Sequence, residues 1–242
     1  MRILLTLQYL GTRYAGWQSQ INAVAIQNVV EEAMTKVYGS PIRIEGASRT
    51  DAGVHATAQR AHADVPFEIA FRGLVRGLND LLPPDIRVTA AEQVADDFQC
   101  RHRAKSKTYV YSIWNDEVAD VFAAETHAHV AQPLNAELMH ETAQVLIGEH
   151  DFRAFTVAAP EVSSTVRTIS DIAVMKRGPA IAITVAADGF LRYMVRRIAG
   201  SLIEIGRGKL EPAALARSLE PSFEAARWTA VAKGLTLVAI RY

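Results

Sequence analysis

The stretch Ala47-Ser48-Arg49-Thr50-Asp51-Ala52-Gly53-Val54-His55 lies between two segments whose composition predicts β-strands. It brings one carboxylate, Asp51, one guanidinium, Arg49, and one turn-forming glycine, Gly53, into a few residues. A guanidinium within about 4–6 Å favours the ionised form of an aspartate and lowers its pKa by roughly 1–3 units. Such a turn suits a nucleophilic carboxylate, although on its own it is more typical of a loop with a capping aspartate.

The size of the chain allows a substantial hydrophobic core. It has 242 residues, half of them hydrophobic, which fits one large domain or two small ones. Its longest apolar runs are far shorter than the roughly 20 residues of a membrane-spanning helix. Residues 1–9 lack the small-residue cleavage site of a signal peptide and favour a first strand instead. We therefore expect a cytoplasmic protein.

The cysteine and histidine content gives little support to a metal or cofactor site. Cys100 is the single cysteine, which excludes an internal disulfide and a multi-cysteine zinc site. His127 and His129 lie two residues apart, but no third ligand has suitable spacing. No segment matches a phosphate-binding loop, a dinucleotide fingerprint or a nucleophile elbow. The sequence predicts neither a metal nor a cofactor.

Charge is unevenly distributed although the net charge is zero. Residues 108–152 contain eight acidic residues and no lysine or arginine. Basic residues gather in two groups: Arg101, Arg103, Lys105 and Lys107 in one, and Arg192, Arg196, Arg197, Arg207 and Lys209 in the other. A neutral protein with segregated charge can present a basic groove to phosphate groups. Solvated basic faces without a ligand are the alternative.

Hydrophobic periodicity predicts strands and helices in alternation. In the first part the predicted strands are residues 3–9, 42–45, 58–65 and 86–94, and the predicted helices are residues 26–37 and 71–78. Near residue 100 the pattern begins again, with strands at 108–115, 168–175, 180–186 and 235–240, helices at 134–147 and 190–205, and a short helix after Pro212. We therefore predict an α+β fold with an N-terminal half, residues 1–100, and a C-terminal half, residues 101–242. Functional sites tend to form where such halves meet.

The predicted helix 190–205 carries arginines beside a wide apolar face. At about 100° per residue, Arg192 and Arg196 lie together on one edge of that face, and Arg197 lies on the other side. Arg196 could therefore reach inward to a carboxylate such as Asp51, while Arg192 or Arg197 contacts phosphate. The alternative, which this segment alone slightly favours, is a helix whose arginines extend to water.

Tyr109 begins a predicted strand immediately after the basic group that ends at Lys107. An aromatic ring beside positive charge is the combination that holds a nucleotide, because the ring stacks on the base while the cation contacts phosphate. Tyrosines in strands more often pack in the core, and we assign that role to Tyr111.

The motif around Asp51 closely resembles the RTDAGVH signature of the TruA family of tRNA pseudouridine synthases. Five other segments resemble the same family in the same order, and together they span nearly the whole chain: Tyr14-Ala15-Gly16-Trp17-Gln18, Asp97-Phe98-Gln99-Cys100-Arg101, Lys107-Thr108-Tyr109-Val110-Tyr111, residues 190–200, and Gly234-Leu235-Thr236-Leu237.

The resemblance implies a pseudouridine synthase fold with a mixed, largely antiparallel central sheet, flanking helices, and two similar α+β halves around a cleft. It also implies a homodimer that binds tRNA and converts uridines at positions 38, 39 and 40 of the anticodon stem-loop to pseudouridine. Among the matching positions, Asp51 is the implied nucleophile, Tyr109 the active-site tyrosine that contacts the flipped base, and Arg196 the arginine paired with the aspartate. Arg49 is implied in substrate handling and nucleotide flipping, and we add Lys107 and Arg197 as candidate substrate contacts.

Several positions depart from the family pattern. Leu10 stands where the family usually has aspartate, Ser48, Ala56 and Ala58 stand where it usually has glycine, and Arg197 replaces a common asparagine. None of these departures removes a catalytic side chain. They leave open which tRNA positions are modified and how the cleft and the dimer are built.

Other functions remain compatible with parts of the pattern. A nucleoside hydrolase would use Asp51 with a second acid, because glycoside hydrolysis normally requires two flanking carboxyl groups. An RNA-binding protein could keep the fold without catalysis, and a structural interaction protein would need none of these side chains. The combination of Asp51, Tyr109 and Arg196 favours the isomerase.

Overall fold

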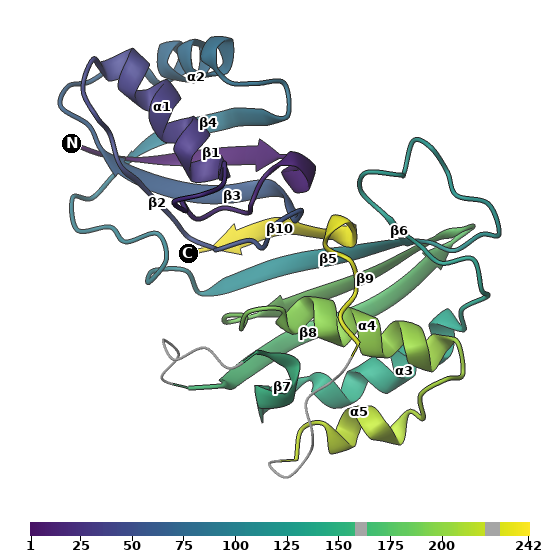
Figure 1. Ribbon diagram of the computed structural model, residues 1–242. Helices are drawn as coiled ribbons and strands as arrows, with labels where there is room; N and C mark the ends of the chain where they lie inside the picture. The colour runs from purple at the N-terminus through teal and green to yellow at the C-terminus, as the bar shows by residue number, and fades with distance from the viewer. Residues whose placement is uncertain (158–163, 221–227) are drawn as a thin grey trace. The chain divides into compact units, whose positions relative to one another are not determined.

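The structure, a computed structural model, describes residues 1–157, 164–220 and 228–242 (Figure 1). Its chain divides into two compact units, which contain residues 1–105 with 237–242 and residues 106–236. The expected halves were residues 1–100 and 101–242. The division in the structure lies slightly later, and the C-terminal end returns to the first unit because its last strand hydrogen-bonds to a strand of that unit.

The first unit is a sheet with two helices. Its elements are β1 (Arg2–Tyr9), the short 3₁₀ turn η1 (Gly11–Arg13), α1 (Ile26–Tyr38), β2 (Ile44–Gly46), β3 (His55–Asp64), α2 (Phe71–Leu81), β4 (Ile86–Val94) and most of β10 (Leu235–Arg241). The strands lie in the order β4-β1-β3-β10, and β2 also pairs with β3. β1 runs antiparallel to both β3 and β4. Figure 1 shows α1 and α2 together beside this sheet, and α2 contacts β4.

The core of the first unit follows from its apolar pattern. Ile3, Leu5 and Leu7 alternate along β1 and are fully buried, as expected for a central strand covered by helices. α1 begins at Ile26 and ends where Gly39 adopts a left-handed conformation with φ of 70°, which glycine tolerates without strain.

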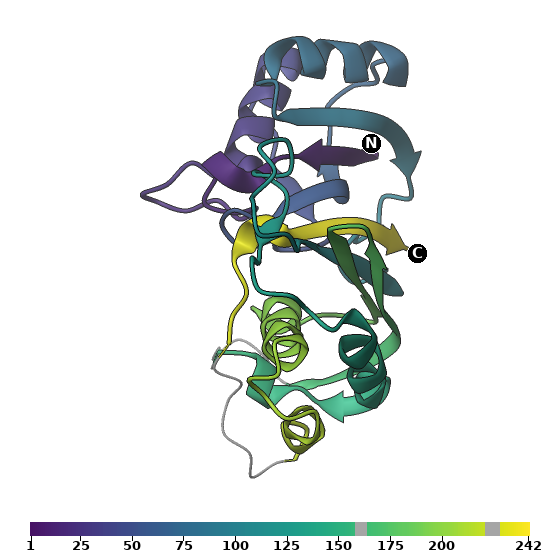
Figure 2. The same cartoon turned by 90° about the vertical axis from the view of Figure 1, so that its right-hand side faces the viewer.

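The second unit contains its own strands and helices. Its elements are β5 (Ser106–Trp114), β6 (Ala128–His129), α3 (Ala136–Ala143), η2 (Gln144–Leu146), β7 (Gly148–Asp151), η3 (Arg153–Phe155), β8 (Val166–Arg177), β9 (Ala180–Ala187), α4 (Met194–Gly206), α5 (Ala213–Arg217) and η4 (Ala232–Gly234). The strands lie in the order β5-β9-β8-β7 with antiparallel pairing, and β6 pairs with β5 in parallel. Figure 2 shows α3 and α4 side by side, and the two helices contact each other.

These elements confirm the predicted α+β class with mixed, mostly antiparallel strands. The predicted helix at 134–147 is shorter, because α3 ends at Ala143 and continues only as the 3₁₀ turn η2. The strand β7 then begins at Gly148, which has a φ of 107°, and was not anticipated. In the part of the chain that the structure describes, no helix is long and apolar enough to cross a membrane.

The prediction for residues 190–205 was wrong at its N-terminal end. α4 begins at Met194, because Tyr193 has a left-handed backbone with φ of 65° that breaks the helical path. Phe190 lies in the loop between β9 and α4, where its ring packs edge-on against Tyr109 at 5.2 Å between centroids. Arg192 therefore lies outside the helix, and the expected pairing of Arg192 with Arg196 on one helical face does not occur.

Candidate active site

Residues 47–54, here called the Asp51 loop, connect β2 to β3 in the first unit. Buried and exposed positions alternate along its residues 48–51. Ser48 and Thr50 are buried, whereas Arg49 is exposed and Asp51 is partly exposed. The loop thus presents its guanidinium and its carboxylate on the outward positions while its other polar side chains anchor it.

The backbone of the Asp51 loop is hydrogen-bonded to a segment far earlier in the chain. The N–H of Trp17 donates to the carbonyl oxygen of Thr50 at 3.0 Å, and the N–H of Gly53 donates to that of Tyr14 at 3.3 Å. Within the loop, the N–H of Val54 donates to the carbonyl oxygen of Asp51 at 3.1 Å. Backbone bonds therefore fix the main chain on both sides of the aspartate.

Buried side chains complete this support. Gln59 on β3 is fully buried, and its amide pairs with both backbone groups of Ser48, donating to the carbonyl oxygen at 2.6 Å and accepting from the N–H at 3.2 Å. The hydroxyls of Tyr9 and Thr50 lie 2.9 Å apart in a buried hydrogen bond. Buried polar groups are costly unless paired, so these contacts specify one conformation for the loop.

Two glycines allow the close approach of the earlier segment. A Cβ on Gly16 would lie 2.5 Å from the carbonyl oxygen of Thr50, and the φ of Gly16 is 91°. A Cβ on Gly11 would overlap the carbonyl oxygen of Val54. The N–H of Gly11 also donates to Nδ1 of His55 at 3.0 Å. His55 is the first residue of β3, so this hydrogen bond joins the start of that strand to η1.

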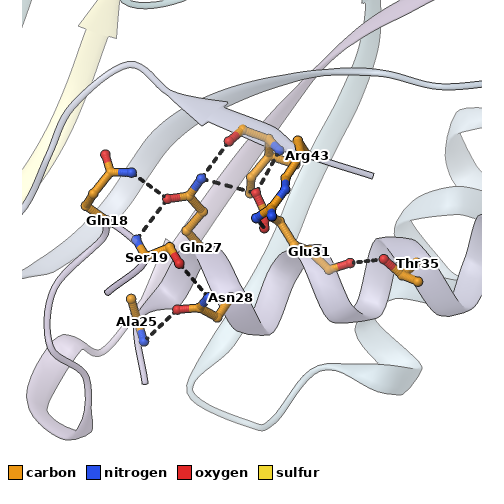
Figure 3. Close-up of polar contacts among 9 residues, drawn as sticks. Gln18, Ser19, Ala25, Gln27, Asn28, Glu31, Thr35 and Arg43 are labelled. Carbon is orange, nitrogen blue, oxygen red and sulfur yellow. Dashed lines mark hydrogen bonds and ion pairs between the residues drawn. The ribbon is translucent and has the colours of Figure 1, made fainter. Parts of the chain in front are cut away.

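The segment that supports the Asp51 loop is itself tied to α1 (Figure 3). The side-chain oxygen of Gln27 accepts from Nε2 of Gln18 and from the N–H of Ser19, both at 3.0 Å. Its nitrogen donates to Glu31 at 3.1 Å and to the carbonyl oxygen of Ile44 at 2.9 Å. One buried amide therefore joins the 14–19 segment, α1 and β2.

Tyr14 has a second anchor at its hydroxyl. Its Oη donates to Asp85 at 2.8 Å. Burial, together with this hydrogen bond, raises the pKa of Tyr14 to about 12. The hydroxyl therefore stays protonated in the physiological range and holds its bond to Asp85.

The second unit carries the other candidate residues. Tyr109 is buried on β5, and Lys107 lies two residues earlier on the same strand with partial exposure. Tyr111 is also buried, and its hydroxyl donates to the carbonyl oxygen of Val231 at 2.9 Å. Burial raises the pKa of Tyr111 far above its ordinary value. Tyr111 is thus a core residue, as expected.

Arg196 lies in the first turn of α4 and contacts both backbone and an aromatic ring. Its Nε donates to the carbonyl oxygen of Ala230 at 2.8 Å. Its guanidinium carbon lies 5.1 Å from the centroid of the Tyr193 ring, and that of Arg192 lies 5.0 Å from the same centroid. Both arginines therefore lie beside the Tyr193 ring, an arrangement that the helical pattern did not predict.

Arg197 faces a different part of the second unit. Its Nη1 donates to the carbonyl oxygens of Ala154 and Thr156, at 3.1 and 2.6 Å. Burial lowers the pKa of the Arg197 guanidinium from its ordinary value. These bonds join α4 to the segment that contains η3.

The candidate residues thus form one group in each unit. Asp51 and Arg49 share a loop of the first unit, whereas Lys107, Tyr109, Arg196 and Arg197 lie in the second. Across the described ranges, no three histidine, cysteine, aspartate or glutamate side chains gather as metal ligands would.

Sequence reasoning missed Gln59 and Tyr193. Gln59 shares one face of β3 with the buried residues Ala61 and Ala63, and a polar residue in that pattern was the available signal. Tyr193 gave no signal, because its residue type does not reveal a left-handed backbone.

Comparison with known proteins identifies the family. The family model described as tRNA pseudouridine synthase matches residues 6–124 and 142–242. A protein of Idiomarina loihiensis named tRNA pseudouridine synthase A is 41% identical, and the alignment covers 100% of this chain and 93% of that protein. Proteins of the same name from Myxococcus xanthus and Pelobacter propionicus are 40% and 39% identical, covering 100% and 99% of this chain and 92% and 99% of theirs. The chain belongs to the tRNA pseudouridine synthase family, and the expected pseudouridine synthase fold is confirmed.

Proposed function

We propose that this protein isomerises uridine to pseudouridine in the anticodon stem-loop of tRNA, at positions 38, 39 and 40, with Asp51 as the catalytic carboxylate. The observation that carries the proposal is the Asp51 loop, whose backbone is fixed by Trp17, Tyr14 and Gln59 while the carboxylate stays partly exposed. Family membership over nearly the whole chain supports the same reaction.

In this proposal each candidate residue has a distinct role. Asp51 attacks, Arg196 pairs with its carboxylate, and Tyr109 packs on the target base. Arg49, exposed two residues before the aspartate, occupies the space that the base leaves. Lys107 contacts the RNA backbone, and Arg197, bonded to two carbonyl oxygens, contributes by holding the η3 segment toward the substrate.

The chemistry requires the target nucleotide to leave its stack, at a cost of a few kcal/mol. Asp51 then assists cleavage of the bond between C1′ of the ribose and N1 of uracil, either by removing a sugar proton to give a glycal-like species or by adding to the ring. The base rotates, a bond forms between C1′ and C5, N1 gains a proton and C5 loses one. The reaction has no net redox change and activates no water, so one carboxylate suffices where glycoside hydrolysis normally uses two.

The proposed partners are tRNA and a second copy of the chain, in the cytoplasm. Arg101, Arg103 and Lys105 are exposed, which suits contacts with RNA phosphates. Such contacts supply most of the affinity of proteins for nucleic acids and make it sensitive to salt.

The decisive experiment compares the parent protein with Asp51→Asn on unmodified tRNA, with pseudouridine mapped by chemical labelling. We expect modification at positions 38–40 by the parent and none by Asp51→Asn, with tRNA binding largely retained. Asp80→Asn, an exposed aspartate on α2, is the matched control and should keep activity. Equal activity of the parent and Asp51→Asn would reject the role of Asp51, and release of uracil by the parent would identify a hydrolase instead.

A further inference from the structure

Arg13 and Asp85 form an ion pair of unequal exposure in the first unit. The Nε of Arg13 donates to Oδ2 of Asp85 at 3.1 Å, and its Nη2 lies 2.8 Å from the same oxygen. The side chain of Arg13 is 72% exposed, whereas that of Asp85 is 7% exposed. The pair therefore covers its carboxylate and presents its guanidinium to solvent.

Asp85 is fixed by further hydrogen bonds. Its other carboxylate oxygen, Oδ1, accepts from the hydroxyl of Tyr14 at 2.8 Å, and its backbone carbonyl oxygen accepts from the N–H of Leu10 at 2.9 Å. Both carboxylate oxygens thus have a partner, as a buried charge requires. An arginine that is bonded to a fixed carboxylate has one preferred orientation of its plane, so it loses little further freedom when it binds a ligand.

One edge of the Arg13 guanidinium remains available. Within the parts of the chain that the structure describes, the side chain of Arg13 bonds only to Asp85, through Nε and Nη2. Its Nη1 carries further N–H donors. A planar guanidinium with donors to spare matches the oxygens of a phosphate group, so this edge suits an anionic ligand in solvent.

Arg13 lies at the end of the first unit's sheet that carries the Asp51 loop. Tyr9, the last residue of β1, pairs with Ala56 of β3 and with Ile86, the first residue of β4. The Asp51 loop leads into β3 at this end, and Asp85 directly precedes β4. The 3₁₀ turn η1, which ends at Arg13, begins two residues after β1. Three segments that are distant in sequence therefore gather at one end of the sheet.

The main chain beside Arg13 is bonded directly to the Asp51 loop. The N–H of Gly53 donates to the carbonyl oxygen of Tyr14, the residue after Arg13, at 3.3 Å. The Asp51 loop also approaches Gly11 so closely that a Cβ there would overlap the carbonyl oxygen of Val54. An RNA that places a uridine at the Asp51 loop therefore meets the end of the sheet where Arg13 offers an exposed guanidinium of fixed orientation.

We propose that Arg13 is a tRNA-binding residue, whose exposed guanidinium edge contacts a backbone phosphate near the target uridine. This inference rests on the proposed function, since its ligand is the RNA substrate of the Asp51 loop. Phosphate contacts fix the register of a nucleic acid on a protein without reading its sequence. Arg13 thus contributes affinity and register, and it takes no part in the chemical step.

Arg43 provides a matched control in the same unit (Figure 3). It is also an exposed arginine paired with a covered carboxylate: its Nη1 lies 2.9 Å from Oε2 of Glu31, and the two side chains are 83% and 10% exposed. Arg43 lies toward the opposite end of the sheet, because the next residue, Ile44, pairs with Ala63 near the end of β3. The two ion pairs are therefore alike in kind and differ in their position relative to the Asp51 loop.

The first test measures tRNA binding by the parent, Arg13→Gln, Arg13→Lys and Arg43→Gln. Dissociation constants for unmodified full-length tRNA are measured over a range of salt concentrations, with a melting temperature for each protein. We expect Arg13→Gln to weaken binding roughly three- to tenfold and to reduce the slope of log affinity against log salt by about one. Arg13→Lys should keep the slope because it keeps the charge, but it should lose part of the affinity because it lacks the planar fork. Arg43→Gln should keep both.

Phosphate ethylation interference then locates the contact. Sparsely ethylated tRNA is partitioned by each protein, and the ethylated phosphates in the bound fraction are mapped. The parent and Arg43→Gln should exclude tRNA that is ethylated at particular phosphates near the target uridine, whereas Arg13→Gln should accept it. The same pattern for the parent and Arg13→Gln, or an equal loss of affinity in Arg13→Gln and Arg43→Gln, overturns the inference. A loss confined to the melting temperature also overturns it, because the ion pair would then be purely structural.

The proposed function is judged separately from this inference. A parent that binds tRNA but makes no pseudouridine refutes the function, and the binding measurements on Arg13 still decide its contact with phosphate. An active parent whose affinity, salt slope and ethylation pattern are unchanged by Arg13→Gln refutes only the role of Arg13.

Discussion

The backbone N–H of Trp17 donates to the carbonyl oxygen of Thr50 at 3.0 Å, directly before Asp51 in the chain. Trp17 is buried, so this hydrogen bond anchors the Asp51 loop to the interior of the first unit. A catalytic group must be held within a fraction of an ångström of its productive position. The hydrogen bond between Trp17 and Thr50 restrains the backbone of the Asp51 loop, although loops are usually less precisely positioned than helices and strands.

The close approach at Gly16 predicts a large effect of a single methyl group. Gly16→Ala places its Cβ 2.5 Å from the carbonyl oxygen of Thr50 and strains a residue with φ of 91°. We expect a loss of about 2 kcal/mol or more in the free energy of unfolding, with a marked fall in turnover. Gly39→Ala is the control, since Gly39 also has positive φ but nothing within 4 Å, and should cost about 1 kcal/mol without affecting turnover. Urea denaturation and pseudouridine formation measure both, and equal effects of the two variants would contradict the argument.

Gln59 should contribute to stability and to turnover although it lies outside the Asp51 loop. Gln59→Leu removes two hydrogen bonds between the Gln59 amide and the backbone of buried Ser48. Each buried hydrogen bond contributes roughly 0.5–1.5 kcal/mol, so we expect a destabilisation of about 1–3 kcal/mol and slower turnover. Gln93→Leu, at an exposed position of β4, should be near neutral. If chemical denaturation finds the two variants equally stable, the amide of Gln59 does not support the loop.

Alanine at two helical glycines, Gly77 and Gly200, should change the stability of the protein in opposite directions. Alanine normally stabilises a helix interior relative to glycine by about 1 kcal/mol, and Gly77 in α2 has nothing within 4 Å. Gly77→Ala should therefore stabilise the protein. Gly200→Ala in α4 should destabilise it, because its Cβ would overlap the carbonyl oxygen of Trp228. Thermal unfolding of the two variants tests this, and stabilisation by both would exclude close packing at Gly200.

Stability should fall in mild acid because of His62. Its Nδ1 lies 3.2 Å from the sulfur of Cys100 in the interior of the first unit, and burial lowers the pKa of His62 below its ordinary value of 6.5. The unfolded chain therefore binds a proton at a higher pH than the folded one, and stability is lost as pH falls below about 6.5. Unfolding free energies between pH 8 and pH 5 should show a shallower decline for His62→Gln. Burial also lowers the pKa of His127, so part of the slope should persist until His127 is replaced as well.

Lys107 should affect binding rather than chemistry. If it contacts a phosphate, Lys107→Gln weakens tRNA binding and reduces the slope of log affinity against log salt by about one, with single-turnover rates at saturating tRNA retained. Lys36→Gln is the control, since Lys36 is paired with Glu32 on α1. Filter binding over a range of salt concentrations measures the slopes, and the same slope for Lys107→Gln and the parent would remove Lys107 from the interface.

Much of the fold could be predicted because local pattern and burial agree. The first strand and the helical period of α1 were both identified, and β4 was predicted with its observed bounds, Ile86–Val94. The position of Asp51 in a turn between two strands was also predictable, because glycine and aspartate in that spacing favour a turn. The two-unit division was less accurate, since the return of β10 to the first unit depends on pairing with β3.

The sequence by itself determined which side chains are available for chemistry and which local elements carry them, because residue type and periodicity are local properties. Only the tertiary structure decided that Gln59 closes on Ser48, that Gly16 lies against Thr50, and that Tyr193 interrupts the predicted helix. These features arise where segments distant in the chain pack together, and the energies of such contacts exceed the local preferences that a sequence pattern records.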